Sequence, residues 1–204
     1  MPTQNASATL YTLAETAINA ATQGSSYAIP STPNASITAA INIWTAPTST
    51  TTPASGIVVH VQVHKDASCN EQNWEDLVLF GTGTTAAVTD TTTAAITGGS
   101  GNTVAMTGAA TFGARTALLY IRDSSSAGEW IYALKQASST LTLPTNATFQ
   151  VSHSSGVSIY SQAQMNSLLV DVSGYKRMRL LIDNNTQATG PGYAVFATIE
   201  TWCP

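Results

Sequence analysis

Charge is what this 204-residue chain has least of. Only 9% of its residues are Asp, Glu, Lys or Arg, against about 25% in an ordinary soluble domain. The 7 basic and 11 acidic side chains leave a net charge of −4, which excludes a generally basic nucleic-acid binder. Hydroxyl groups take the place of charge, with 21 Ser and 32 Thr beside 30 Ala. Because such a surface is easily desolvated, we expect a protein that packs against many neighbours.

Long apolar runs and cysteine are also scarce. No stretch approaches the ~20 consecutive apolar residues of a membrane span, so no membrane partner is expected. The N-terminal residues have neither the basic segment nor the continuous apolar core of a secretory signal. Two cysteines, Cys69 and Cys203, are too few for a disulfide framework. We interpret them as separate thiols, with a late disulfide that pins the C-terminus as the alternative.

The residues that usually carry chemistry form no recognisable set. His60 and His64 share one face of a predicted strand about 13 Å apart, which is too far for one metal ion, and His153 is remote in sequence. The three are interpreted as ordinary surface histidines. Glycine-rich stretches such as "GTGTT" lack the Lys and the helix of a phosphate-binding loop, and no Ser or Cys stands in a nucleophile elbow. The sequence therefore predicts no enzyme, no catalytic residue, no metal and no cofactor.

What the chain does have is apolar residues at every second position. The apolar face of its clearest predicted strand consists of Ile57, Val59, Val61 and Val63. The other face of that strand is mostly polar, which is typical of antiparallel sheet with a core on one side and water or a partner on the other. Residues 36–47 alternate in the same way. Such strands recur about every ten residues with turn signals between them, so we predict an all-β fold, an antiparallel β-sandwich.

The expected organisation is one domain preceded by an arm. Residues 1–35 are predicted to form an N-terminal arm or edge segment, and their pattern permits a helix within 9–23 as well as the strand that we favour. Residues 36–204 form the single β-sandwich domain. It contains a low-complexity insertion around 81–114, whose scattered Val, Ile, Met and Phe residues are unlike those of a flexible linker. We interpret this insertion as short strands and long loops that lie on a surface.

The stretch 171–185 holds three of the chain's 7 Lys and Arg residues. Turn signals flank a run of strand length. Alternation predicts a core face of Lys176, Met178, Leu180 and Ile182, and an opposite face of Tyr175, Arg177, Arg179 and Leu181. We interpret Tyr175, Arg177 and Arg179 as a candidate protein interface, because arginine and tyrosine are enriched in protein contacts. Two arginines offer too few phosphate contacts for nucleic acid. Solvated arginines that pair with Asp171 or Asp183 are the alternative.

Tryptophan is the remaining residue type with a possible binding role. The four tryptophans are Trp44, Trp74, Trp130 and Trp202. Their rings could form platforms on which sugars stack. The apolar residues that surround them in the predicted strands favour burial in a core or an interface instead.

Three stretches of the chain form a recognisable series. They read "TLYTLAETAINAATQGSSYAI", "IVVHVQVHKDASCNEQNWEDLVLF" and "GYKRMRLLIDNNTQATGPGYAVFATIE". In the second, the strand Val59–Val63 precedes Asp66, Trp74 and the pair Asp76-Leu77. In the third, an Arg-rich strand over Lys176–Ile182 precedes a closing strand over Tyr193–Ile199. The series resembles that of small head-associated proteins of tailed bacteriophages, in which the Arg-rich strand pairs with the closing strand.

The resemblance implies a fold and a function. The fold would be a β-sandwich of jelly-roll type with an extended N-terminal arm and long loops. The function would be that of a capsid cement or decoration protein on the exterior of the virion, synthesised in the host cytoplasm, trimeric, and bridging subunits of the major capsid protein. Two alternatives stay open: a carbohydrate-binding or receptor-binding β-sandwich module that uses the tryptophans, and a tail or head-closure component of the virion.

Overall fold

The computed structural model describes residues 3–13, 22–23, 26–30, 36–48, 56–68, 73–82, 87–108, 112, 117–123, 128–137, 139–183 and 193–203. Within these ranges the chain forms β-strands and connecting turns, and no helix is present. The sheets are antiparallel throughout. The predicted all-β fold is therefore confirmed. No helix of the described ranges has the length and apolar character needed to cross a bilayer.

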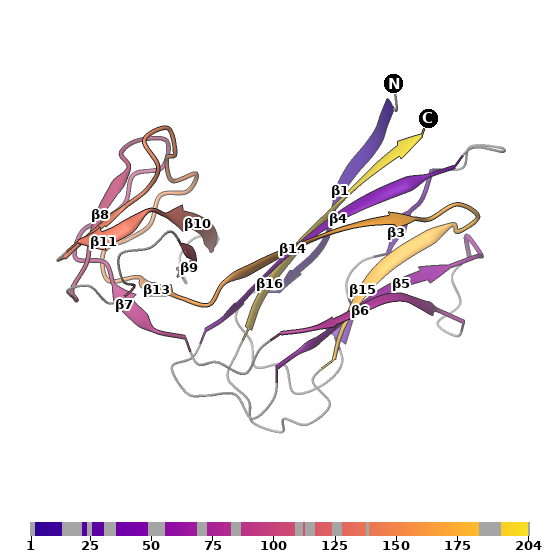
Figure 1. Ribbon diagram of the computed structural model, residues 1–204, viewed down its shortest axis with the longest axis horizontal. Coiled ribbons are helices and arrows are strands. Elements are labelled where there is room, and N and C mark those ends of the chain that lie inside the picture. Colours follow the sequence, from indigo (N-terminus) through magenta and orange to yellow (C-terminus); the bar gives the residue numbers. More distant parts are fainter. Residues whose placement is uncertain are drawn as a thin grey trace.

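Two sheets face each other in the larger part of the molecule, at the right of Figure 1. The first has the order β1-β16-β4-β14, with bounds Thr3–Leu13, Tyr193–Cys203, Thr38–Pro47 and Gln164–Asp171. The second has the order β2-β15-β5-β6, with bounds Thr22–Gln23, Arg177–Asp183, Val58–His64 and Glu75–Gly81. The short strand β3 (Tyr27–Ala28) also pairs with β15. This pair of sheets is called the sandwich below.

The sandwich is held together by the apolar faces that alternation predicts. Ile41 and Ile43 of β4 have no exposed surface, and the same is true of Val59, Val61 and Val63 of β5. Their side chains meet those of β15 and β16 in one buried cluster between the sheets. Each such side chain contributes roughly 1.5–3 kcal/mol by its removal from water. The confirmed alternation thus accounts for the relative position of the two sheets.

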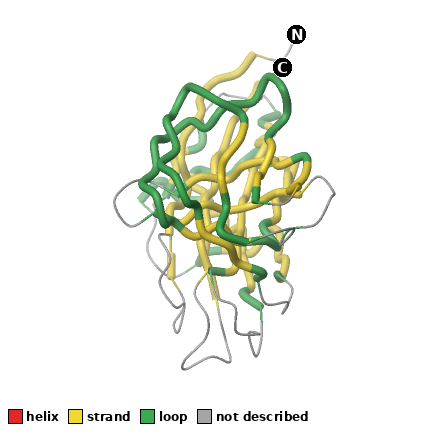
Figure 2. Tube along the Cα trace, turned by 90° about the vertical axis from the view of Figure 1, so that its left-hand side faces the viewer, coloured by secondary structure: helices red, strands yellow, loops and turns green. Residues whose placement is uncertain are grey.

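A second group of strands forms a lobe beside the sandwich, at the left of Figure 1. One of its sheets has the order β10-β9-β13-β7, with bounds Glu129–Ala133, Ala117–Arg122, Ser158–Tyr160 and Thr89–Thr91. The other has the order β11-β12-β8, with bounds Lys135–Ala137, Thr140–Thr142 and Thr103–Ala105. Figure 2, which looks onto the lobe, shows that loops make up much of it.

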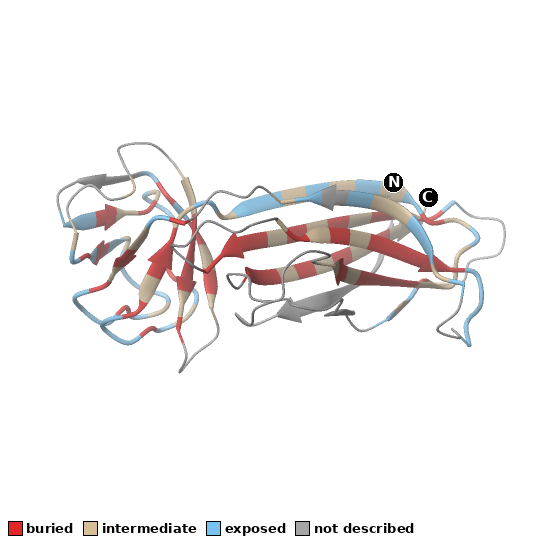
Figure 3. Cartoon of the chain, turned by 90° about the horizontal axis from the view of Figure 1, so that it is seen from below, coloured by how far each residue is buried: buried red, intermediate tan, exposed pale blue. Residues whose placement is uncertain are grey.

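The lobe has a hydrophobic core of its own. Ile96, Val104 and Met106 are buried there with Leu119 and Phe149. The short strands expected within 81–114 are present as β7 and β8, but the expectation that the segment lies on a surface is wrong for its apolar residues Ile96, Val104 and Met106. The sparse apolar side chains of this segment point inward and meet strands that follow much later in the chain. Figure 3 shows the buried residues of the lobe as a group separate from those of the sandwich.

The lobe is inserted between two strands of the sandwich. The chain leaves β6, passes through the lobe and returns in β14. At the neck the Ser161 amide donates to the Val88 carbonyl over 2.9 Å, and the Val88 amide donates to the Ser161 hydroxyl over 2.8 Å. A small cluster that includes Tyr120 of the lobe and Ala46 and Ala194 of the sandwich fills the junction.

One expected strand pairing is absent. The resemblance implies that the Arg-rich strand pairs with the closing strand, but β15 pairs with β5, whereas β16 pairs with β4 and β1. The two strands lie in opposite sheets and meet through side chains in the core. At the N-terminus, β1 is the outermost strand of its sheet, which is the edge segment named as one of two possibilities. The rest of the helix alternative, over residues 14–21, lies outside the described residues.

Candidate functional site

The predicted interface residues lie on the outer face of the sheet that contains β15. The chain enters this strand through a turn at Gly174, whose φ of 82° is readily adopted only by glycine. In β15, Arg177 lies opposite His64 and Arg179 lies opposite Gln62 of β5. Met178, Leu180 and Ile182 point into the core, as predicted, with no exposed surface. The alternation therefore places the arginines on the outer face of the sandwich.

Arg179 does not reach into solvent, although it points away from the core. Its exposed fraction is 8%, and its Nε donates a 2.9 Å hydrogen bond to Oε1 of Gln62. The guanidinium carbon lies 4.2 Å from the centroid of the Trp74 ring, which covers it. Gln62 in turn donates from Nε2 to Oδ1 of Asp76 over 3.0 Å. This chain of contacts, called the Arg179 network below, runs from the buried Arg179 to the exposed Asp76 and holds the outer face of the sheet.

Arg177 and Tyr175 belong to a more exposed group next to this network. Arg177 donates from Nε to the Ala67 carbonyl over 3.2 Å, and the Tyr175 hydroxyl donates to Glu75 over 3.4 Å. Lys65 pairs with Glu75 at 3.1 Å, and its Nζ lies 5.7 Å from the centroid of the Tyr175 ring. The hydrogen bond that Lys65 donates to Glu75 raises the pKa of Lys65. Lys65, Glu75, Tyr175 and Arg177 are called the rim below.

The alternative of arginines paired with Asp171 or Asp183 does not describe these contacts. Both Nε groups donate elsewhere, to Ala67 and to Gln62. Asp171 instead accepts from the hydroxyl and the amide of Ser173, and these bonds lower its pKa. The candidate triad is thus divided: Arg179 is a buried member of the Arg179 network, whereas Tyr175 and Arg177 are half-buried members of the rim.

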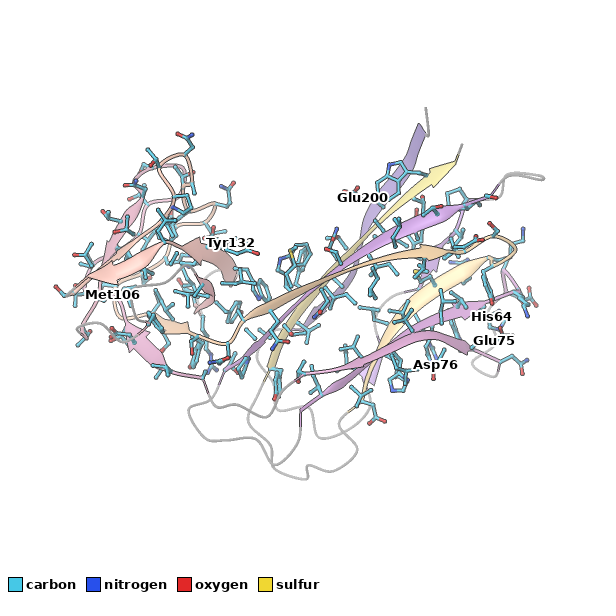
Figure 4. All side chains as sticks on the ribbon, in the orientation of Figure 1. His64, Glu75, Asp76, Met106, Tyr132 and Glu200 are labelled. Carbon is cyan, nitrogen blue, oxygen red and sulfur yellow. The ribbon has the colours of Figure 1, made fainter. Side chains whose placement is uncertain are left out.

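The interpretation of all three histidines as surface residues is wrong. His64 is 4% exposed, accepts at Nδ1 from the Asp66 amide over 2.9 Å, and has its ring 5.2 Å from that of Trp74. Figure 4 shows His64, Glu75 and Asp76 grouped at the same end of the sandwich. His60 is half-buried and contacts Asp76 at 3.2 Å.

His153 occupies a buried position in the lobe between two carboxylates. Its Nδ1 lies 3.2 Å from Oδ2 of Asp123 and its Nε2 lies 3.1 Å from Oε2 of Glu129. Glu129 also accepts from the Gln150 amide over 2.6 Å, and Asp123 accepts from the Ser154 amide over 3.3 Å. The cluster fastens the chain around His153 to β10 and to the end of β9. No motif in the sequence indicates this cluster, because its two carboxylates stand 30 and 24 residues before His153.

These acidic and histidine side chains do not converge on a metal position. In the described ranges, no three His, Cys, Asp or Glu side chains have the arrangement of a metal site. Cys69 and the Cys203 side chain, whose pairing was left open, lie outside the described residues.

Three of the four tryptophans, Trp44, Trp74 and Trp130, pack against other side chains. Trp130 lies 4.5 Å from Tyr120 and 6.1 Å from Phe196, measured between ring centroids, and Trp44 lies 5.4 Å from Phe196. The indole Nε1 atoms of Trp74 and Trp130 are buried, and no acceptor contacts them within the described part of the chain. The rings of Trp44 and Trp130 thus form an aromatic seam with Phe196 at the junction of sandwich and lobe.

The chain was compared with known proteins, and no family model, no curated protein and no solved structure matches it. The rim is therefore the candidate site on the strength of its own chemistry. It combines an exposed ion pair, an aromatic ring and an arginine on a strand whose neighbours are locked by the Arg179 network. Such a surface can bind another protein, since its polar groups are held in place before contact.

Proposed function

We propose that this chain is a non-enzymatic structural protein of a phage virion. In this proposal it is a cement or decoration protein on the capsid exterior that bridges subunits of the major capsid protein, and it acts as a homotrimer of jelly-roll type. The proposal starts from the resemblance of three stretches of the sequence to head-associated proteins of tailed bacteriophages. Support comes from the scarcity of charge and from an all-β framework with two hydrophobic cores, which presents much rigid surface for its length.

The rim is the observation that carries the proposal. Among the described residues, no acceptor contacts the terminal guanidinium nitrogens of Arg177, because its one hydrogen bond to the Ala67 carbonyl uses Nε. A planar guanidinium with two such nitrogens can bind a carboxylate of a partner in a bidentate manner. Tyr175 beside it adds apolar area with little loss of conformational freedom. The rim is thus suited to a protein partner with acidic side chains.

Repetition on a shell would strengthen a contact of this size. The rim has few residues and would bind a single capsid subunit weakly. A trimer would present three rims at once, and each contact after the first would form at a high effective concentration. This multiplicity agrees with a sandwich that has little charge, because neighbouring copies repel one another weakly.

The tryptophan contacts do not favour a sugar-binding module. A stacking platform needs an open ring face, whereas Trp74 is covered by Arg179 and the Trp130 ring lies between Tyr120 and Phe196. The capsid proposal is therefore the one that we carry forward.

The test is decoration of capsids that lack this protein, measured by co-sedimentation. Arg177→Gln removes the guanidinium of the rim and leaves the Arg179 network intact, so we expect the fold to be retained. Loss of one charged hydrogen bond of about 1.5–3 kcal/mol predicts binding weakened about tenfold or more. Arg122→Gln in β9 of the lobe makes the same charge change and should decorate like the parent. A parent protein that does not bind capsids at all contradicts the proposal. If Arg177→Gln and Arg122→Gln bind capsids equally well, the rim does not take part in attachment.

A further inference from the structure

Strand β14 forms an open edge of the sandwich. It is the last strand of the sheet β1-β16-β4-β14 in the described part of the chain, and it pairs with β4 along all 8 of its residues without a bulge. Its outer side chains are exposed, with Leu169 74% and Met165 44% accessible to solvent. Figure 3 shows the strand as a pale-blue and tan ribbon along the molecule. A long, regular edge with exposed apolar residues is a template for a further strand.

The register identifies which backbone groups of β14 are open. The Val172 amide, just beyond the strand, donates to the Ile37 carbonyl over 2.9 Å, so the backbone of residue 172 faces β4. Backbone direction alternates along a strand, and the groups of residues 170, 168, 166 and 164 therefore also face β4. Those of Met165, Ser167, Leu169 and Asp171 face away from it. The open amides and carbonyls thus belong to the same residues whose side chains are exposed.

The two other long edge strands carry features that hinder pairing, and β14 does not. Strand β6 has a register shift against β5 between Val61 and Gln62, and its first two residues are the exposed carboxylates Glu75 and Asp76. Strand β1 has two register shifts against β16. The β14 sequence QMNSLLVD contains no Lys, Arg or Pro, which are the residues that usually protect an edge. Its single charge, Asp171, lies at its end.

We propose that β14 pairs with β14 of a second copy of this chain, antiparallel and across a two-fold axis centred on Ser167. The open residues read Met165, Ser167, Leu169, which is an apolar–hydroxyl–apolar pattern that is the same in both directions. This register places Met165 of each copy opposite Leu169 of the other. In this register Asp171 of one copy lies opposite residue 163 of the other, which is eight residues before that copy's own Asp171. The two Asp171 carboxylates are therefore about 27 Å apart.

The pairing extends the outer face of the sheet, on which apolar side chains lie next to the edge. Met165 is followed by Trp44 and Phe196 in one row across the strands, whereas Leu169 is followed by Ala40 and then by Glu200. In the dimer these rows join across the axis into one sheet of twice the width. The contact does not depend on the rim or on a capsid. It would join single chains, or trimers if the chain forms them, in pairs.

The first test is the molar mass in solution, measured by light scattering after size exclusion. The parent should have the mass of an even number of chains, and Leu169→Lys should halve it, because a lysine on an edge strand opposes pairing. The matched control is Leu79→Lys on the edge strand β6, where the leucine is 53% exposed. Both substituted positions are exposed, so both variants should fold. A parent that is monomeric or trimeric, or an equal loss of mass in the two variants, overturns the proposal.

The second test fixes the register. Ser167→Cys places two cysteines opposite each other with Cα atoms about 5.5 Å apart, which is within the range that a disulfide spans. Mild oxidation should then give a covalent dimer that the parent, with its own two cysteines, does not give. Asp171→Cys should give no more dimer than the parent. Cross-linking of Asp171→Cys instead of Ser167→Cys contradicts the pairing. A Leu169→Lys variant that keeps the molar mass of the parent but no longer binds capsids also contradicts it.

Discussion

Arg179 offers the sharpest test of how the outer face of the sandwich is held. Replacement by methionine keeps an unbranched apolar side chain against Trp74 and removes the guanidinium group. The loss comprises the hydrogen bond to Gln62, about 1.5–3 kcal/mol for a charged donor, and the cation–π contact with Trp74, about 0.5–2 kcal/mol. Because Arg179 is 8% exposed, solvent screens neither interaction strongly. We expect Arg179→Met to lower the free energy of unfolding by roughly 2–5 kcal/mol.

The measurement is urea unfolding, followed by tryptophan fluorescence and by circular dichroism. With an m-value of about 1–3 kcal/mol/M, the expected loss of roughly 2–5 kcal/mol moves the unfolding midpoint by about 0.7 M or more. Arg177→Met is the matched control, since its side chain is half-buried and donates from Nε to a single backbone carbonyl. Its cost should stay near 1 kcal/mol or below. Equal costs for the two variants would refute the Arg179 network as a stabilising element.

Two further predictions concern a buried cluster and a turn. His153→Leu removes the central member of the Asp123–His153–Glu129 cluster and should cost about 3–5 kcal/mol, because two buried carboxylates lose their shared partner; a cost below 1 kcal/mol in urea unfolding contradicts this. Ser173→Ala removes the hydroxyl that lowers the pKa of Asp171, so the pKa should rise in an NMR titration. As the folded pKa is lowered, the stabilisation is present above the ordinary Asp pKa and is lost as the pH falls through the lowered value.

The sequence was sufficient for the direction of the side chains but not for the partners of the strands. Alternation over residues 57–63 and 176–182 specified which residues enter the core, because the two faces of a strand differ by one position. The hairpin of β9 and β10 was also predictable, since its strands are adjacent in the chain. Whether β15 pairs with β16 or with β5 depends on contacts between strands that lie far apart in the sequence, and alternation contains no information on such contacts.

The covering of Arg179 and the burial of His153 could not be predicted for a related reason. Alternation placed Arg179 correctly on the outer face, yet Trp74, from more than one hundred residues earlier, covers it. The core of the lobe could not be predicted because the sequence over 81–114 is of low complexity. Val104 and Met106 are isolated among Ala, Thr and Gly, and only their distant partners, such as Leu141 and Phe149, show that they belong to a core.

The neck between Val88 and Ser161 makes the lobe a replaceable module. Because the chain enters and leaves the lobe through one pair of hydrogen-bonded residues, a lobe of another length or sequence can be accommodated without a change in the order of the sandwich strands. The lobe also meets the sandwich away from this neck, in the aromatic seam where Trp130 contacts Phe196. Substitutions within the lobe can therefore change the surface that the lobe displays, whereas substitutions in the aromatic seam can change the direction in which the lobe points.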